Sequence, residues 1–183
     1  MKITTELVKT FNPCKDRFHN YQTNYPNSDL HIVDFLKLEN ITYNDKIWVW
    51  KKVATINEAA LFGLKCADSV LHIFEDKYPN DKRPRLALDS VRTYLDNPTE
   101  ENKKECREAS YDAAFAAYDV YATAAYSAAY SAAYAAYAVI AYSTAYTAPY
   151  VAAYAADAAD TAAAGKTQQD KNIQFLIEIY EGK

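Results

Sequence analysis

The sequence predicts an all-α fold, a compact helical bundle with long helices rich in alanine and tyrosine and an irregular N-terminal segment. Apolar residues recur at intervals of three and four between residues 57 and 95, which is the spacing of one helix face. Neither glycine nor proline occurs from residue 99 to residue 148. Most of the 17 tyrosines lie between residues 109 and 164, where alanine, the strongest helix former, is the commonest residue.

A length of 183 residues suits one domain, and no segment has the composition of a linker. We therefore expect a single helical domain over residues 1–183. Within it we expect an irregular N-terminal segment over residues 1–45, a helical core over residues 47–164 and a C-terminal helix over residues 167–181.

The first 30 residues show no periodicity and contain several turn-forming pairs, so we expect short elements and loops wrapped on the bundle. Ser28 or Asp29 can cap a helix that ends near Asn40, because serine and aspartate are favoured at the N-cap. Asp45 can cap the next helix, which carries Trp48 and Trp50. The same Ile-Trp-Val-Trp run could instead be a strand.

Three stronger helix starts follow. Asn57 opens a helix that should stop near Tyr78, before a proline. Pro84 suits the first turn of the next helix, which should end at Asn97. Thr99, followed by two glutamates, opens the long alanine and tyrosine segment.

This segment is too long to form one straight helix in a compact domain. A continuous helix would extend about 75 Å, whereas the radius of gyration of a domain of this size is roughly 16 Å. Tyr126, Tyr130, Tyr134 and Tyr137 fall on one stripe of a helix, and the following tyrosine series is rotated by about 140°. We therefore expect a bend or turn near residues 138–141.

The end of the segment carries its own signals. Gly165 is expected to end the alanine-rich run as a C-cap. Thr167 and Asp170 then resemble a capping box at the start of a final helix.

Charge and composition restrict the partners. A net charge of −4 and a pI near 5.4 argue against binding of duplex nucleic acid, which requires clustered Lys and Arg. Charged residues interrupt the first apolar positions, so a signal peptide is not expected. The sequence also lacks an uninterrupted apolar run of about 18 residues. We therefore expect a cytoplasmic protein that does not bind membranes.

The sequence offers little material for catalysis. Cys14, Cys66 and Cys106 are too widely spaced for a zinc site or a disulfide framework, and they are expected to be reduced. The chain has three glycines and no glycine-rich phosphate loop. A group formed by His72 and the acids Glu75 and Asp76 is the one candidate for a metal or a general base. We expect no cofactor, no metal and no enzymatic activity.

Residues 66–102 carry a family resemblance. They contain the helix sequence CADSVLHIFE and then the turn sequence YPNDKRPR. Together with a Trp-containing helix before them and Ala-rich helices after them, these motifs resemble a family of immunity proteins found in bacteria and phages. The resemblance covers roughly residues 47–164. It implies a protein that neutralises a toxin or a defence factor by binding, in the host cytoplasm if a phage encodes it, and it supplies no catalytic residues.

Basic residues gather at the YPNDKRPR turn. Lys82, Arg83 and Arg85 stand at a helix N-terminus, where the helix dipole favours negative charge. A bound phosphate would balance them. Nearby carboxylates could instead neutralise them within the chain, which we consider the simpler interpretation. Arg92 lies two turns beyond Arg85 on the same helix face, so both guanidinium groups could reach one groove.

The tyrosine stripe also has two interpretations. An aromatic stripe at helical spacing is usually part of a core. Buried phenols need hydrogen-bond partners, however, and a partly open cavity lined by hydroxyl groups would explain the choice of tyrosine better. Tyr126, Tyr130 and Tyr134 could then stack on a base, and Trp48 could add a further stacking surface.

Two functions follow from these observations. In the first, the chain is a non-catalytic conflict protein, a sponge that inhibits immune signalling by sequestering a small phosphate-containing nucleotide, with a homodimer as one way to close the pocket. The ligand would contact Trp48, three arginines (Arg83, Arg85 and Arg92) and the tyrosine stripe. In the alternative, an immunity protein occludes a toxin or defence enzyme with its acidic, tyrosine-rich face, whose aspartates are Asp112, Asp119, Asp157 and Asp160.

Overall fold

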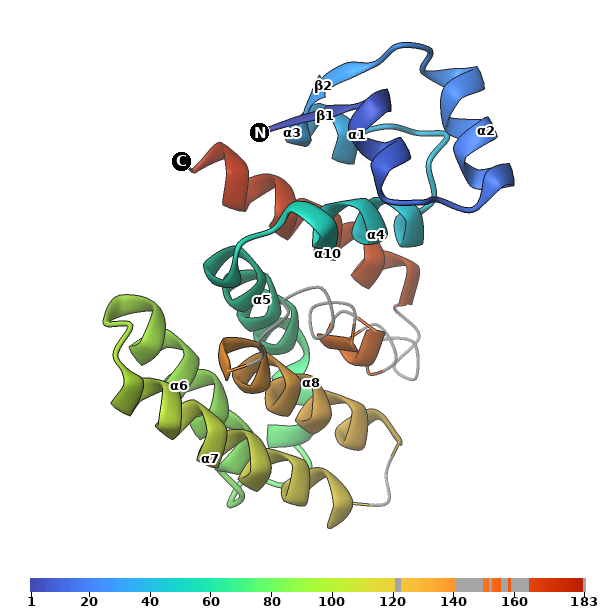
Figure 1. The fold of residues 1–183 in the computed structure, drawn as a ribbon. Coiled ribbons are helices and arrows are strands. Elements are labelled where there is room, and N and C mark those ends of the chain that lie inside the picture. Colours follow the sequence, from blue (N-terminus) through green and yellow to red (C-terminus); the bar gives the residue numbers. More distant parts are fainter. Residues whose placement is uncertain (121–122, 141–149, 152, 156–157, 159–164, 183) are drawn as a thin grey trace.

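Helices make up most of the protein, which confirms the predicted all-α class (Figure 1). The computed structural model describes residues 1–120, 123–140, 150–151, 153–155, 158 and 165–182. The elements are β1 (Lys2–Thr4), α1 (Thr5–Thr10), α2 (Lys15–Asn24), β2 (Asp29–His31), α3 (Ile32–Leu36), α4 (Tyr43–Val53), α5 (Ile56–Glu75), α6 (Arg83–Asp96), α7 (Glu100–Tyr118), α8 (Thr123–Ile140) and α10 (Gly165–Glu181).

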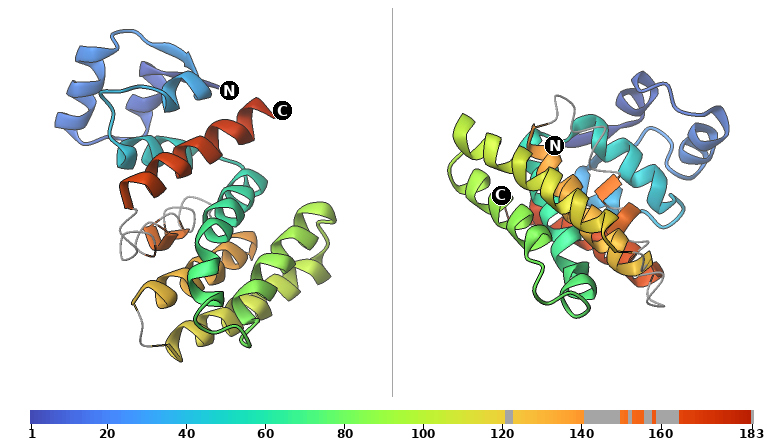
Figure 2. Two further views of the ribbon diagram at one scale, coloured as in Figure 1. Left: turned by 180° about the vertical axis from the view of Figure 1, so that it is seen from behind. Right: turned by 90° about the horizontal axis from the view of Figure 1, so that it is seen from below.

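The elements are arranged in three parts along the molecule. The N-terminal elements from β1 to α3 lie at one end, and α5 to α8 form a helical bundle at the other end (Figure 1). The helices α4 and α10 lie between these two parts, and the C-terminus comes close to the N-terminal elements (Figure 2). The last helix therefore connects the two ends, packing against both α3 and α5.

A two-stranded antiparallel sheet forms within the N-terminal part, where the sequence predicted a helix. Strand β2 pairs with β1, with His31 opposite Lys2. The helix capped by Ser28 or Asp29 was therefore predicted wrongly: α3 begins at Ile32, and its N-cap is His31, whose ring accepts a hydrogen bond from the amide of Val33.

The hydrogen bonds of Ser28 explain this difference. Its hydroxyl group lies 2.6 Å from the hydroxyl of Tyr21 and 3.1 Å from that of Thr5. Its carbonyl accepts a hydrogen bond from the amide of Thr5 at 3.1 Å. The side chain that could have capped a helix is thus bound to α1 and α2 instead.

The next helices begin close to their expected positions. The Ile-Trp-Val-Trp run lies in α4, so the strand interpretation was wrong. Thr42 caps α4 in place of Asp45, accepting a hydrogen bond from the amide of Asp45. Thr55 and Glu58 form a capping box at the start of α5, which ends at Glu75.

The alanine and tyrosine segment contains a break that the sequence did not indicate. Thr99 caps α7, as expected, and this helix ends at Tyr118. Helix α8 ends at Ile140, within residues 138–141 where a bend was expected, and residues 141–149 lie outside the described residues. Helix propensity allows α7 to continue, so the local sequence gives no stop at Tyr118. The carboxylate of Asp119, which follows the last turn, binds Arg83 of α6 at 2.7 Å.

Helix α8 is the centre of the bundle, packing against α5, α6 and α7. Its small side chains allow this, because Ala128, Ala132 and Ala135 are fully buried. On α5, a Cβ atom added to Gly63 would lie 3.5 Å from the Cα atom of Ala135. The helices therefore approach closely where both carry small residues.

The C-terminal helix forms, although its start differs from the prediction. Gly165 was expected to be a C-cap but is the first residue of α10. The segment of residues 159–164 before it lies outside the described residues. Within α10, Leu176 and Ile179 are buried, which attaches the helix to the core.

Candidate interaction surface

Two carboxylates neutralise Arg83 at the start of α6. Its Nε and Nη2 atoms donate to both carboxylate oxygens of Asp81, the shortest distance being 2.7 Å. Its Nη2 atom also donates to Asp119 at 2.7 Å. The hydrogen bonds from Arg83 hold the pKa of Asp81 below its ordinary value. This arginine thus ties the YPNDKRPR turn to the end of α7.

The arginines Arg85 and Arg92 lie together, as their spacing predicted. Arg85 donates a hydrogen bond to one oxygen of Asp68 on α5 at 2.8 Å, and Arg92 forms an ion pair with the same oxygen at 2.9 Å. Arg85 also forms a two-pronged pair with Glu75, with distances of 2.9 and 2.7 Å, and these hydrogen bonds lower the pKa of the Glu75 carboxyl group. Arg92 forms a second pair with Asp89 at 2.6 Å. Carboxylates of the chain therefore neutralise all three predicted ligand arginines.

Large aromatic side chains are exposed along one face of α7. Tyr111, Phe115 and Tyr118 are 55%, 61% and 66% exposed. Their spacing of four and three residues places them on the same side of the helix. Tyr137 of α8 and Tyr150 are exposed as well. We call these five residues the aromatic face.

Stacked tyrosine rings connect α7, α8 and the residues after α8. The ring of Tyr130 lies 5.6 Å from that of Tyr118, 4.7 Å from that of Tyr126 and 5.3 Å from that of Tyr154, measured between ring centroids. The ring of Tyr134 stacks on that of Tyr154 at 5.3 Å. Burial of the phenol raises the pKa of Tyr130, and its neighbours Tyr118 and Tyr126 raise it further.

A groove of about 310 Å³ opens between α7 and α8 beside the stacked rings. Its lining consists of small residues and tyrosines: Ser110, Tyr111, Ala114, Tyr130, Ala133, Tyr134 and Tyr137. The stripe thus passes from core to surface, because Tyr130 is 9% exposed whereas Tyr137 is 38% exposed. The stripe therefore belongs to the core at one position of α8 and to the wall of the groove at another.

The structure does not bring Trp48 to this groove. Trp48 lies on α4, where its ring contacts Phe11 edge-on at 6.2 Å and the ammonium group of Lys52 lies 5.6 Å from the ring centroid. It lines a different pocket, formed with the N-terminal elements. The predicted ligand residues therefore fall into three places: the arginine and carboxylate cluster, the tyrosine groove and the N-terminal pocket.

Sequence reasoning missed Phe115 and its two aromatic neighbours on α7. The signal was present, because Tyr111, Phe115 and Tyr118 recur at helical spacing. It was hard to recognise because α7 lacks a strong apolar stripe that separates its buried side from its exposed side. Its buried positions are alanine, serine and cysteine, so its largest apolar side chains are the exposed ones.

The aromatic face carries negative charge. No Lys or Arg occurs between residues 109 and 164. Asp112 is exposed and forms no ion pair with the described residues, whereas Asp119 is paired with Arg83. Asp157 and Asp160, the other two predicted acids of this face, lie outside the described residues.

The candidate metal or base site shows no further ligands. Glu75 is bound to Arg85, and His72 is exposed on α5. Across the described part of the chain, no three His, Cys, Asp or Glu side chains gather in a group that could hold a metal ion. None of the helices described there is long and apolar enough to span a bilayer.

A small helical fold with an exposed aromatic surface is typical of proteins that act by binding. Residues 53–182 match the family described as Imm-5 like putative immunity protein, and the chain belongs to this family. The match includes α10, whereas the N-terminal elements and nearly all of α4 precede it. No curated protein and no solved structure matches the chain.

Proposed function

We propose that the protein acts as an immunity protein by binding a toxin or defence enzyme through the aromatic face. Membership of an immunity-protein family supports inhibition by binding. The observation that supports the location is the row of exposed Tyr111, Phe115 and Tyr118, which continues into a tyrosine-lined groove. Aromatic side chains are enriched at interfaces because they bury a large area at a small entropic cost.

Charge indicates the kind of partner. The aromatic face lies in a region without Lys or Arg and exposes the carboxylate of Asp112. A basic surface, such as the active site of an enzyme that acts on nucleic acid, would complement it. Long-range attraction would then speed association, and added salt would slow it.

The test compares surface variants of similar size. Phe115→Ser and Tyr118→Ser remove exposed rings of the aromatic face, and Leu86→Ser is the control, because Leu86 is 58% exposed on α6 and lies outside the face. A partner that binds the wild type and the Leu86→Ser variant should be lost by both face variants. It should also dissociate as salt rises. Equal binding by all four proteins would refute the proposed location.

Sequestration of a small phosphate-containing nucleotide is the second candidate function. The groove is of the size of small ligand sites, and its tyrosines could stack on a base. Phosphate would have to compete for Arg83, Arg85 or Arg92, each of which already binds carboxylates. A homodimer that covers the groove would enclose such a ligand.

Thermal unfolding with a panel of cyclic nucleotides and ADP-ribose derivatives tests this second function, because a ligand that binds the native state raises its stability. A large rise in the unfolding temperature with one compound would indicate sequestration if that compound is recovered chemically intact after the protein is denatured. Absence of a shift across the panel would leave the protein partner as the better account. Sedimentation velocity with and without the bound compound would detect a dimer.

A further inference from the structure

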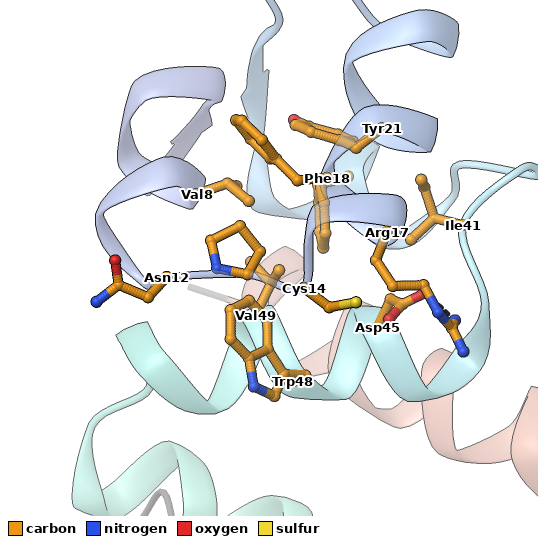
Figure 3. A pocket seen from close by; sticks show the side chains of 12 residues that line it. Val8, Asn12, Cys14, Arg17, Phe18, Tyr21, Ile41, Asp45, Trp48 and Val49 are labelled. Carbon is orange, nitrogen blue, oxygen red and sulfur yellow. Dashed lines mark hydrogen bonds and ion pairs between the residues drawn. The ribbon is translucent and has the colours of Figure 1, made fainter.

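A second cavity lies outside the region matched by the family model. It has a volume of about 260 Å³ and is enclosed by α1, the turn after α1, α2, α3 and α4. Figure 3 shows its walls, with Phe18 and Tyr21 on one side and Trp48 and Val49 on the other. All its lining residues precede residue 53, where the family match begins. This cavity is therefore independent of the aromatic face.

One part of the cavity wall is apolar and offers few hydrogen bonds to water. Val8, Phe35 and Val49 are buried apolar side chains of the wall. The hydroxyl of Tyr21 is already bonded to Ser28 at 2.6 Å. Water in an apolar site with few partners is readily displaced by an apolar group. The interior of the cavity therefore favours a flat apolar occupant that can lie against aromatic rings.

The rim carries charges that cancel. Arg17 and Asp45 form an ion pair at 2.7 Å, and Thr42 bonds to both of them. Figure 3 shows this pair on the side of the cavity opposite Asn12. A charged ligand would lose hydration on entry without meeting an unpaired charge, which is unfavourable. The rim therefore favours a ligand without net charge.

We propose that this cavity binds a small, uncharged, planar aromatic molecule. The ring lies between the aromatic walls formed by Phe18, Tyr21 and Trp48. Each part follows from a separate feature: the ring from the walls, and the neutrality from the Arg17–Asp45 pair.

Isosteric probes test this class directly. Benzamide, benzoate and benzamidine share one shape but are neutral, negative and positive, and cyclohexanecarboxamide keeps the amide but loses the planar ring. The full chain, labelled with ¹⁵N, is titrated with each probe while amide and indole resonances are recorded. We expect benzamide to shift the resonances around Asn12 and Trp48 saturably, and to bind at least about tenfold more tightly than the other three probes.

Two variants fill the cavity from different walls. Val49→Phe and Val8→Phe should each weaken benzamide binding by about tenfold or more. Asn44→Ala, an exposed position of α4 outside the cavity lining, should leave it unchanged. Unshifted resonances of α7 and α8 show that each variant is folded, and having two variants protects the test if one fails to fold.

Three results would overturn the proposal. The first is that no probe causes a saturable shift, and the second is that benzoate or benzamidine binds as tightly as benzamide. The third is that folded Val49→Phe and Val8→Phe bind benzamide as the wild type does. The test does not involve the aromatic face, so its failure would leave the proposed immunity function untouched.

Discussion

At the scale of single residues, a buried polar network joins α4, α5 and α10. Asn172 of α10 is fully buried, and its side chain donates to the hydroxyl of Tyr43 at 3.0 Å. Its carbonyl oxygen accepts from the thiol of Cys66 at 3.3 Å and from the amide of Gln168 at 2.9 Å. One side chain therefore satisfies polar groups from three helices. Burial raises the pKa values of both Cys66 and Tyr43.

Asn172→Leu should destabilise the fold by about 2–4 kcal/mol, because it leaves several buried polar groups without their partner. Urea unfolding followed by circular dichroism measures the change. Gln174→Leu, an exposed position of the same helix, is the control and should change stability by less than about 0.5 kcal/mol. A similar loss in both variants would contradict the role of the network.

The pair of Glu75 with Arg85 gives a second prediction at this scale, with a defined pH dependence. The hydrogen bonds from Arg85 lower the pKa of Glu75 in the folded state below its ordinary 4.5. The contribution of the ionised Glu75 carboxylate to stability is therefore complete above pH 4.5, and it is lost as the pH falls through the lower, folded-state pKa.

Glu75→Gln should therefore lower stability by about 1 kcal/mol at neutral pH and by much less near the acid limit of folding. Urea unfolding of both proteins at a series of pH values measures the difference. Glu101→Gln is the control, at an exposed position of α7 without an ion pair to the described residues. Its difference in stability from the wild type should not shrink in this way as the pH falls. A difference that does not change with pH would mean that ionisation of Glu75 contributes nothing.

At the scale of elements, the approach of α5 to α8 leaves room for a methyl group at Gly63. A Cβ atom at this position would lie 3.5 Å from the Cα of Ala135 and from a methyl group of Val151, which is ordinary van der Waals contact. An alanine therefore fits without displacing either helix, whereas a longer side chain does not.

Gly63→Ala should leave stability unchanged or raise it by up to about 1 kcal/mol, because alanine favours a helix. Gly63→Leu should lower stability by about 3 kcal/mol or more through overpacking. Thermal unfolding of the two variants beside the wild type gives both values. Equal tolerance of the two substitutions would show that the helices are not in close contact here.

At the same scale, sequence predicts helices better than the joints between them. The starts of α5, α6 and α7 were predicted closely, because helix caps and Pro84 act through local hydrogen bonds and fixed dihedral angles, although Thr55 and not Asn57 caps α5. The end of α7 was not predicted, because alanine-rich sequence gives no local stop and the contact of Asp119 with Arg83 at this point is tertiary.

The candidate site was predictable to a smaller extent. The proximity of Arg85 and Arg92 followed from their spacing, and so did the tyrosine stripe of α8. The partners of the arginines did not follow from the sequence. Asp68 lies on another helix, and its contacts with both arginines depend on how α5 packs against α6. Trp48 was assigned to the same site because a sequence does not reveal which end of the molecule a helix occupies.

At the scale of the whole molecule, buried phenols link stability to alkaline pH. Burial raises the pKa values of Tyr43, Tyr130 and Tyr180 above the ordinary 10.0. A group whose pKa is raised in the folded state stabilises it fully below the unfolded pKa, and this contribution is lost as the pH rises above about 10. The three tyrosines lie in α4, α8 and α10, so their ionisation affects both the middle of the molecule and the helical bundle.

The protein should therefore unfold cooperatively above about pH 10, with the buried tyrosines ionising in the same transition. Ultraviolet absorbance of phenolate and circular dichroism, recorded on the same samples, report the two events. Ionisation of all phenols in one step near pH 10, with the helices intact, would contradict the burial of Tyr43, Tyr130 and Tyr180.

We propose the aromatic face of α7 and α8 as the surface by which this protein binds its target. Calorimetric titration of the purified target with the wild type, Phe115→Ser and Leu86→Ser proteins tests it most directly. We predict that Phe115→Ser lowers the affinity for the target at least about tenfold, as expected for an aromatic side chain that becomes buried in the complex. Leu86→Ser should leave the affinity unchanged. Equal affinities for Phe115→Ser and the wild type would contradict the claim.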